Sequence, residues 1–157
     1  MRCLVQGSYS HLSSLNWGKA TMRHVIIGGG PTGIYALDTI RKIDEGAAIT
    51  LISDEPAYSR MALPYYLSRE IPEEQVLLGD ERFFQEMRVE AMLGRRATTI
   101  DPQQRVLTLD DGSTLNFDTL LIGTGSSPTR PGIPGTDGPG VTTLWTLREA
   151  RDTVKRA

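Results

Sequence analysis

The chain has 157 residues, of which 39% are hydrophobic and 23% are charged, which is enough for one globular domain with its own core. The formal net charge of −2 argues against a nucleic-acid partner, because no excess of Lys and Arg is present to neutralise phosphates. The single cysteine, Cys3, cannot form an intrachain disulfide, and no apolar run is long enough for a bilayer, so we expect a cytoplasmic protein without a membrane partner.

Residues 1–21 differ in composition from the rest of the chain. They contain several serines, no acidic residue and no continuous apolar stretch. The lack of an apolar stretch disfavours a secretory signal, whereas the serine-rich, acid-free composition is compatible with an organelle transit peptide. Met22 directly precedes a strong strand pattern, so we favour a start at Met22. Residues 1–21 would then be an artefactual or disordered leader, and residues 22–157 the domain.

A strand–helix–strand unit follows the leader. Residues 24–27 are a short β-branched, apolar run that ends in a glycine cluster at residues 28–33. Pro31 suits the first turn of a helix, which we expect to end near residues 45–46. Residues 48–52 form a second apolar strand. This spacing is typical of a βαβ unit.

The middle of the chain changes from helical to alternating patterns. Short helices are predicted at residues 63–67 and 82–87. Residues 96–100 and 105–109 partly alternate apolar and polar side chains, and an Asp-Gly pair then marks a hairpin turn. We therefore predict an antiparallel β-meander over residues 89–116.

The last third of the chain completes the expected fold. Residues 117–122 are read as a third buried strand, and residues 128–140, rich in Pro and Gly, as a loop. Thr146 and Glu149 fit a capping box at the start of a final helix. The fold class expected is α/β, a Rossmann-like parallel sheet with an inserted antiparallel β-meander.

The glycine cluster has the spacing of a dinucleotide turn. Gly28 would let the chain turn sharply out of the strand, Gly30 would let phosphates approach the backbone, and Gly33 would let the helix pack close to the sheet. A pyrophosphate is favoured at a helix N-terminus, where free N–H groups and the helix dipole point at it.

Two acidic residues end the second strand. Asp54 and Glu55 lie 21 and 22 positions after Gly33. A carboxylate there can accept hydrogen bonds from ribose hydroxyls and would repel a 2′-phosphate, which disfavours NADP at this site. The turn and the acids predict an ADP-containing dinucleotide without deciding between FAD and NAD.

Residues 22–155 resemble the FAD-binding segment of pyridine nucleotide-disulfide oxidoreductase-type flavoproteins. The similarity is to the group that contains rubredoxin reductase, ferredoxin reductase, the flavoprotein part of NADH-dependent nitrite reductase and apoptosis-inducing factor. It is carried by the glycine turn with its acids, by the Y-x-R-x-x-L pattern in residues 55–64, and by the sequence TLLIGTGSSP at residues 119–128.

The resemblance implies a set of cofactor-binding residues, in which Ser53 stands where some members carry the ribose-binding acid. Arg60 matches an arginine that contacts FAD, and its guanidinium suits a phosphate or a flavin edge. Ala97 falls where the meander of the family meets adenine. The full set is Gly28, Gly30, Pro31, Thr32 and Gly33 at the pyrophosphate, Asp54 and Glu55 at the ribose, Arg60, Ala97, and Thr124 and Gly125 where the chain passes the cofactor.

The chain also departs from the family. It lacks the C-x4-C disulfide of glutathione-reductase-like members, and Met61 stands where coenzyme A-disulfide reductases carry a cysteine, so no thiol chemistry is expected. No second dinucleotide turn follows, so the chain looks truncated before an NAD(P) domain. His11, His24 and Cys3 have no metal-ligand spacing, so no metal site is predicted.

Three functions compete. The first is an FAD-dependent oxidoreductase that takes hydride from NAD(P)H and passes electrons to a small-molecule or protein acceptor without a redox disulfide. The alternative is a non-catalytic FAD-binding fragment, or a subunit that needs a partner chain; a homodimer is a further option. An NAD-binding dehydrogenase domain is disfavoured by residues 58–64 and the meander. No residue is predicted to be catalytic.

Overall fold

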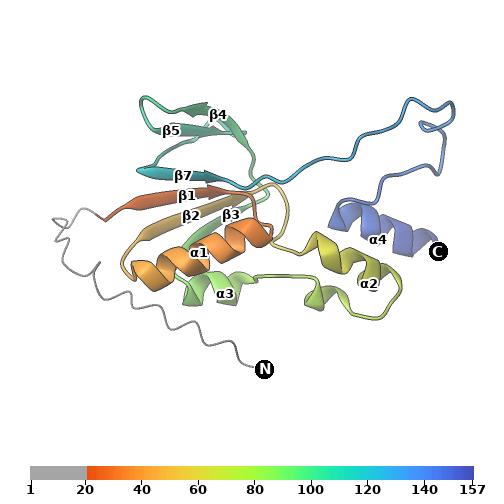
Figure 1. Ribbon diagram of the computed structural model, residues 1–157, viewed down its shortest axis with the longest axis horizontal. Helices are drawn as coiled ribbons and strands as arrows, with labels where there is room; N and C mark the ends of the chain where they lie inside the picture. The colour runs from red at the N-terminus through yellow and green to blue at the C-terminus, as the bar shows by residue number, and fades with distance from the viewer. Residues whose placement is uncertain (1–20) are drawn as a thin grey trace, which may run out of the picture.

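A four-stranded parallel sheet forms the centre of the molecule (Figure 1). The computed structural model describes residues 21–157, so the expected leader lies outside the described residues except for its last position. The strand order is β3-β2-β1-β7, and each neighbouring pair is parallel. The strands are β1 (Arg23–Ile27), β2 (Ala48–Ser53), β3 (Val89–Leu93) and β7 (Thr119–Ile122).

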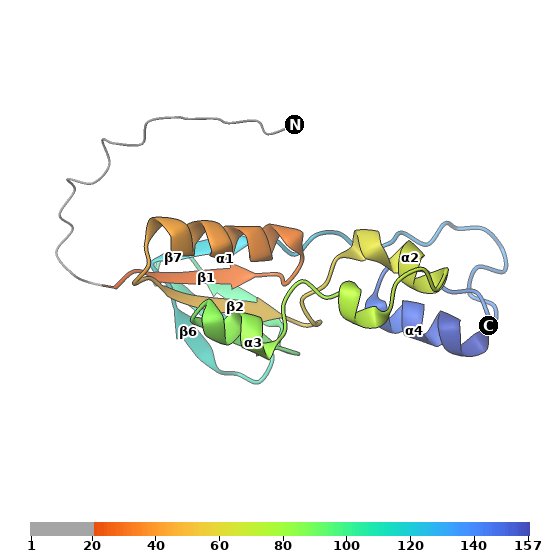
Figure 2. The same ribbon diagram turned by 90° about the horizontal axis from the view of Figure 1, so that it is seen from below.

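Two helices cover one face of this sheet. Helices α1 (Pro31–Ile43) and α3 (Glu81–Glu86) lie on the same side of the strands (Figure 2). Ile34 and Leu37 of α1 and Phe84 of α3 are buried against strand residues such as Ile26. The apolar spacing that predicted α1 is therefore the spacing of its buried face.

A small antiparallel sheet covers the other face. Its order is β4-β5-β6, with β4 (Ala97–Asp101), β5 (Val106–Leu109) and β6 (Thr114–Asn116). Leu107 and Leu109 of β5 pack on Val25 and Ile27 of β1, and all four are buried. The predicted α/β fold with an inserted antiparallel meander is confirmed.

The predicted start of the meander at residue 89 is wrong. Residues Val89–Leu93 form β3, which pairs in parallel with β2 along the register Ile49↔Val89 to Ser53↔Leu93. The sequence of this segment, VEAML, suits a parallel strand as well as an antiparallel one. Gly94 follows with a φ of 76°, a left-handed conformation that glycine adopts readily, and the meander begins beyond it at Ala97.

The prediction of a third buried strand at residues 117–122 is also wrong in part. Phe117 is buried but precedes the strand, and β7 lies at the edge of the sheet. Leu121 is 36% exposed and Ile122 is 59% exposed. Among the described residues β7 pairs only with β1. The apolar run at residues 119–122 therefore does not mean that the strand is buried.

A second helical unit lies beyond the carboxyl ends of the strands. Helices α2 (Leu63–Leu67) and α4 (Leu147–Arg156) pack together through buried Tyr58, Leu63, Val76 and Leu147, beside the short 3-10 helices Arg60–Ala62 and Glu73–Gln75. A long connection without helix or strand joins β7 to α4, which confirms the predicted loop (Figure 1).

The start of α4 has the predicted capping box. The Thr146 hydroxyl accepts from the Glu149 N–H, and the Glu149 carboxylate accepts from the Thr146 N–H. Burial raises the pKa of Glu149, but hydrogen bonds from Thr143 and from the Thr146 and Trp145 backbone outweigh this effect and lower it. Within residues 21–157, every helix falls short of the length and hydropathy that a membrane crossing requires.

Candidate functional site

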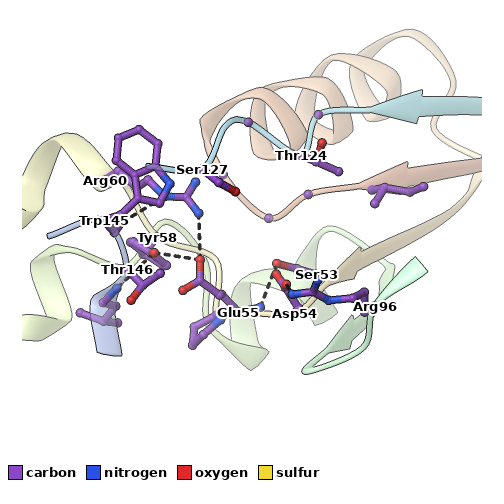
Figure 3. A pocket seen from close by; sticks show the side chains of 18 of the residues that line it. Ser53, Asp54, Glu55, Tyr58, Arg60, Arg96, Thr124, Ser127, Trp145 and Thr146 are labelled. Carbon is purple, nitrogen blue, oxygen red and sulfur yellow. Dashed lines mark hydrogen bonds and ion pairs between the residues drawn. The ribbon is translucent and has the colours of Figure 1, made fainter. Parts of the chain in front are cut away.

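A cavity of about 820 Å³ opens at the carboxyl ends of β1, β2 and β7. Strand β1 has β2 on one side and β7 on the other, and ligands of open α/β sheets bind at such a point outside the strand ends. The start of the meander and the start of α4 close the cavity from two further directions (Figure 3). The site is therefore built from five segments that lie far apart in the sequence.

The glycine turn forms the wall of the cavity next to α1. Gly28 has a φ of 115°, and a Cβ there would lie 2.3 Å from the Gly123 oxygen. A Cβ on Gly33 would lie 2.0 Å from the Gly28 oxygen, whereas one on Gly30 would meet nothing within 4 Å. Gly28 and Gly33 are thus required by the protein's own packing. Gly30 leaves an open approach to the backbone.

The N-terminus of α1 adjoins this open approach. Its first intrahelical bond runs from the Ile34 N–H to the Gly30 oxygen at 3.1 Å, so earlier N–H groups such as those of Thr32 and Gly33 have no partner in the helix. Gly30 is the N-cap and offers no side-chain cap, and Pro31 occupies the first turn. The partial positive charge at this helix end favours an anionic ligand.

Gly28 and Gly30 line the cavity, whereas Pro31, Thr32 and Gly33 are not among its lining residues. The Thr32 side chain lies next to Gly123, where an added Cβ would be 3.2 Å from its methyl group. The sequence motif therefore contains both residues that line the cavity and residues that only pack within the turn.

Asp54 lies at one end of the cavity with Arg96 and Ala97. The Asp54 carboxylate accepts a hydrogen bond of 2.6 Å from the Arg96 guanidinium, and both side chains are largely exposed. All three residues line the cavity, so the predicted ribose acid and the predicted adenine neighbour do lie together. Sequence reasoning missed Arg96, whose partner Asp54 lies 42 positions earlier in the chain.

Glu55 points away from Asp54, toward the opposite end of the cavity (Figure 3). Its Oε2 atom accepts from the Tyr58 hydroxyl at 2.9 Å and from the Arg60 guanidinium at 2.9 Å. Burial raises the pKa of Tyr58 to about 12, so the hydroxyl stays protonated and can donate at neutral pH. The two acids that the sequence grouped together therefore have different partners.

Arg60 marks this opposite end. Its guanidinium carbon lies 5.6 Å from the centre of the Tyr58 ring and 5.3 Å from that of Trp145. Its Nε donates to the Trp145 oxygen at 3.2 Å, and its Nη1 lies 3.5 Å from where a Cβ of Gly125 would stand. Gly125 has a φ of 71° and lines the cavity beside Thr124.

Trp145 was not predicted as a site residue. Its indole N–H donates to the Ser126 oxygen at 2.8 Å, and it lines the cavity. No local pattern marks such a role, because the tryptophan and Arg60 are separated by 85 positions.

The charges around the cavity favour an anion. Arginines outnumber carboxylates in its lining, where Arg60, Arg95, Arg96, Arg148 and Arg151 accompany Asp54 and Glu55. Within the described part of the chain, no group of three or more His, Cys, Asp or Glu side chains is placed to hold a metal ion. The site suits a long anionic ligand that is held by backbone N–H groups and arginines.

Comparisons with known proteins point to one family. The family model described as "Pyridine nucleotide-disulphide oxidoreductase" matches residues 22–156. The benzene 1,2-dioxygenase system ferredoxin--NAD(+) reductase subunit of Pseudomonas putida is 32% identical over 128 residues, which are 80% of this chain and 31% of that protein. The nitrite reductase (NADH) large subunit of Escherichia coli is 34% identical over 120 residues, which are 74% of this chain and 14% of that protein.

A solved structure gives the same result. The NAD-dependent persulfide reductase from A. fulgidus is 31% identical and superposes with a TM-score of 0.79, covering 86% of this chain and 27% of that one. The chain therefore spans a third or less of the length of these relatives. The matched residues include the glycine turn, the acids, Arg60 and the start of α4, and the chain belongs to the pyridine nucleotide-disulphide oxidoreductase family.

Proposed function

We propose that this chain is the FAD-binding part of an NAD(P)H-dependent flavoprotein oxidoreductase. The observation that carries the proposal is the open backbone at Gly30, beside the N-terminus of α1, in the middle of a cavity that runs from Ala97 to Arg60. A dinucleotide has its pyrophosphate in its middle, so the cavity can take its two halves on either side of that point.

The described residues fit FAD along the length of this cavity. Ala97 would meet adenine and Asp54 the adenosine ribose, while Gly30 and the first turn of α1 would hold the pyrophosphate. Gly28, Pro31, Thr32 and Gly33 would shape that turn. Arg60, Thr124 and Gly125 would lie along the flavin half.

When bound, the flavin would supply the capacity to accept a hydride and to pass electrons on. The protein would bind it, orient it and set its surroundings. We propose electron transfer without a redox disulfide, because Met61, which cannot form a thiolate, stands where coenzyme A-disulfide reductases carry a cysteine. A cytoplasmic location is proposed with it, on the single thiol of the chain.

The names of the relatives support a nicotinamide nucleotide as electron donor and a protein or small molecule as electron acceptor. One is a ferredoxin--NAD(+) reductase subunit and another a nitrite reductase (NADH) subunit. We therefore propose NAD(P)H as donor and a protein or small molecule as acceptor. A homodimer or a partner chain would be compatible with that arrangement.

The second candidate is a non-catalytic FAD-binding fragment or a subunit that needs a partner chain. Such a chain would bind FAD in the same cavity and would not react with NADH by itself.

One experiment separates these functions. The purified chain is reconstituted with FAD, and visible absorbance and flavin fluorescence are followed before and after NADH is added without oxygen. Bound flavin that bleaches supports the oxidoreductase, and bound flavin that never bleaches supports the second candidate. A chain that binds no FAD would contradict both.

A further inference from the structure

We propose that Trp145 and Glu55 are positioning residues that fix the guanidinium of Arg60, so that its free N–H groups face the bound dinucleotide near Gly125. This inference rests on the proposed FAD site. Glu55 then binds Arg60 and does not contact the ribose, so Asp54 is the only one of the two acids left to bind the ribose. Trp145 also gains a role in cofactor binding.

The first line of support is the stack around Arg60. The guanidinium lies over the rings of both Tyr58 and Trp145, at 5.6 and 5.3 Å from their centres. Positions within about 6 Å of a ring centre are attractive for a cation. Two rings restrict a side chain that would otherwise sample many rotamers, so the planar group is held in one orientation.

The second line of support is the set of hydrogen bonds at the edge of the guanidinium. Nε donates to the Trp145 oxygen, and Nη2 donates to Glu55. Nη1 donates to none of the described residues and lies beside Gly125. The side chain is 32% exposed, so its remaining N–H groups face the cavity rather than the protein interior.

Trp145 and Tyr58, which hold Arg60, are themselves held by hydrogen bonds. The Trp145 indole donates to the Ser126 oxygen, and the Leu147 N–H donates to the Tyr58 hydroxyl at 3.2 Å. Three segments are joined in this way: the loop after β2, the loop after β7 and the start of α4. A change at Trp145 can therefore reach the cofactor through Arg60.

Glu55 completes the argument. Its Oε2 atom bonds both Tyr58 and Arg60, and its side chain is 23% exposed. A carboxylate engaged in this way neutralises part of the Arg60 charge and sets its direction. The Asp54 carboxylate, by contrast, accepts a hydrogen bond from Arg96.

The test is a pair of double-mutant cycles on FAD affinity, measured by titration of flavin fluorescence with the whole chain. Glu55→Gln and Trp145→Leu are made in the natural chain and in an Arg60→Met chain. Trp145→Leu is expected to weaken FAD binding by about 3- to 30-fold when Arg60 is present, the range for a lost cation–π contact. Glu55→Gln is expected to weaken it by about 2- to 5-fold, because a partly exposed ion pair contributes less. In the Arg60→Met chain, each change is expected to alter the affinity by less than about twofold, because no guanidinium remains to be positioned.

Two controls sharpen the result. Trp145→Phe keeps an aromatic face and should restore most of the affinity that Trp145→Leu loses. Asp54→Asn acts at the other end of the cavity, so its effect should be the same in the natural chain and in the Arg60→Met chain. Thermal melting of each variant identifies losses that come from the fold.

Equal losses with and without Arg60 would overturn the inference, because Trp145 or Glu55 would then contact the cofactor or support the fold directly. The proposed FAD site would survive that result. Failure of the natural chain to bind FAD at all would contradict the proposed function instead.

Discussion

Three glycines of one motif have different surroundings. A side chain on Gly28 or Gly33 would collide with backbone atoms, whereas one on Gly30 would enter open space. The motif is therefore a mixture of residues needed for folding and one residue that leaves room for a ligand. Substitutions can test this difference, because a change at Gly33 should lower the stability of the fold whereas a change at Gly30 should lower only the affinity for the ligand.

Gly30→Val is expected to fold normally and to lose FAD. Gly30 has a φ of −75°, which any residue can adopt, so the backbone is not strained by the change. The new methyl groups would occupy the space where phosphates approach, and we expect affinity to fall by about 100-fold or more, equivalent to about 2.7 kcal/mol. Flavin titration measures the loss, and thermal melting checks the fold.

Gly33→Ala is the matched control. Its Cβ would lie 2.0 Å from the Gly28 oxygen, so overpacking should destabilise the fold by about 1–3 kcal/mol or more. A Gly30→Val protein that still binds FAD tightly, or that melts as early as Gly33→Ala, would show that Gly30 has been assigned the wrong role.

At this scale the sequence reveals some site residues and hides others. Gly30, Asp54 and Arg60 were predicted, and all three line the cavity. Trp145 and Arg96 were not, because their roles arise from contacts across 85 and 42 positions of the chain. A pattern read along the chain contains no information about such pairs until the fold is known.

At the scale of elements, one ion pair joins the first strand to the last strand of the parallel sheet. Asp118, directly before β7, accepts from the Arg23 backbone N–H at 2.8 Å and from its guanidinium at 3.2 Å. These bonds from Arg23 lower the pKa of Asp118 to about 2. The carboxylate thus holds β7 in register with β1.

Asp118→Asn is expected to lower stability in a pH-dependent way. The pKa of Asp118 is lower in the folded state than in the unfolded state, where it is about 3.9. Its contribution is therefore fully present above about pH 4 and is lost as the pH falls through about 2. The urea midpoint of the variant should lie below that of the natural chain at pH 6, and the difference should shrink toward pH 2.

The exposed pair Asp38–Lys42 on α1 supplies the control. Surface pairs at this spacing contribute little, so Asp38→Asn should change the midpoint only slightly at either pH. A difference between the natural chain and Asp118→Asn that stays constant from pH 6 to pH 2 would contradict the assigned cause.

The helices were predicted more accurately than the strands. The apolar spacing in α1 and the Thr146 capping box are local signals, and both were confirmed. The two segments were predicted correctly as strands, but the pairing of β3 and the burial of β7 were predicted wrongly, because a strand's partners are set by distant segments. Val89–Leu93 pairs with β2 although it was assigned to the meander, and Ile122 belongs to an apolar run although its side chain is 59% exposed.

At the scale of the whole molecule, the candidate site lies between parts that have separate cores. The sheet with its two covering layers has two apolar clusters, and the unit of α2 and α4 has a third. The cavity is lined by both the sheet ends and the start of α4. A ligand that fills it would therefore connect these parts.

FAD is accordingly expected to raise the melting temperature of the chain. A ligand that binds only the folded state stabilises it by about 2.7 kcal/mol at a free concentration of 100 Kd. For a domain of this size that corresponds to a shift of about 5–10 °C, which differential scanning fluorimetry or calorimetry can follow as FAD is increased. FMN lacks the AMP part of FAD and should give a smaller shift, because it cannot reach Asp54 and Ala97 while its flavin lies at Arg60. Equal shifts with FMN and FAD would show that the adenine end of the cavity contributes nothing, whereas loss of the FAD shift in Gly30→Val would tie the stabilisation to the glycine turn.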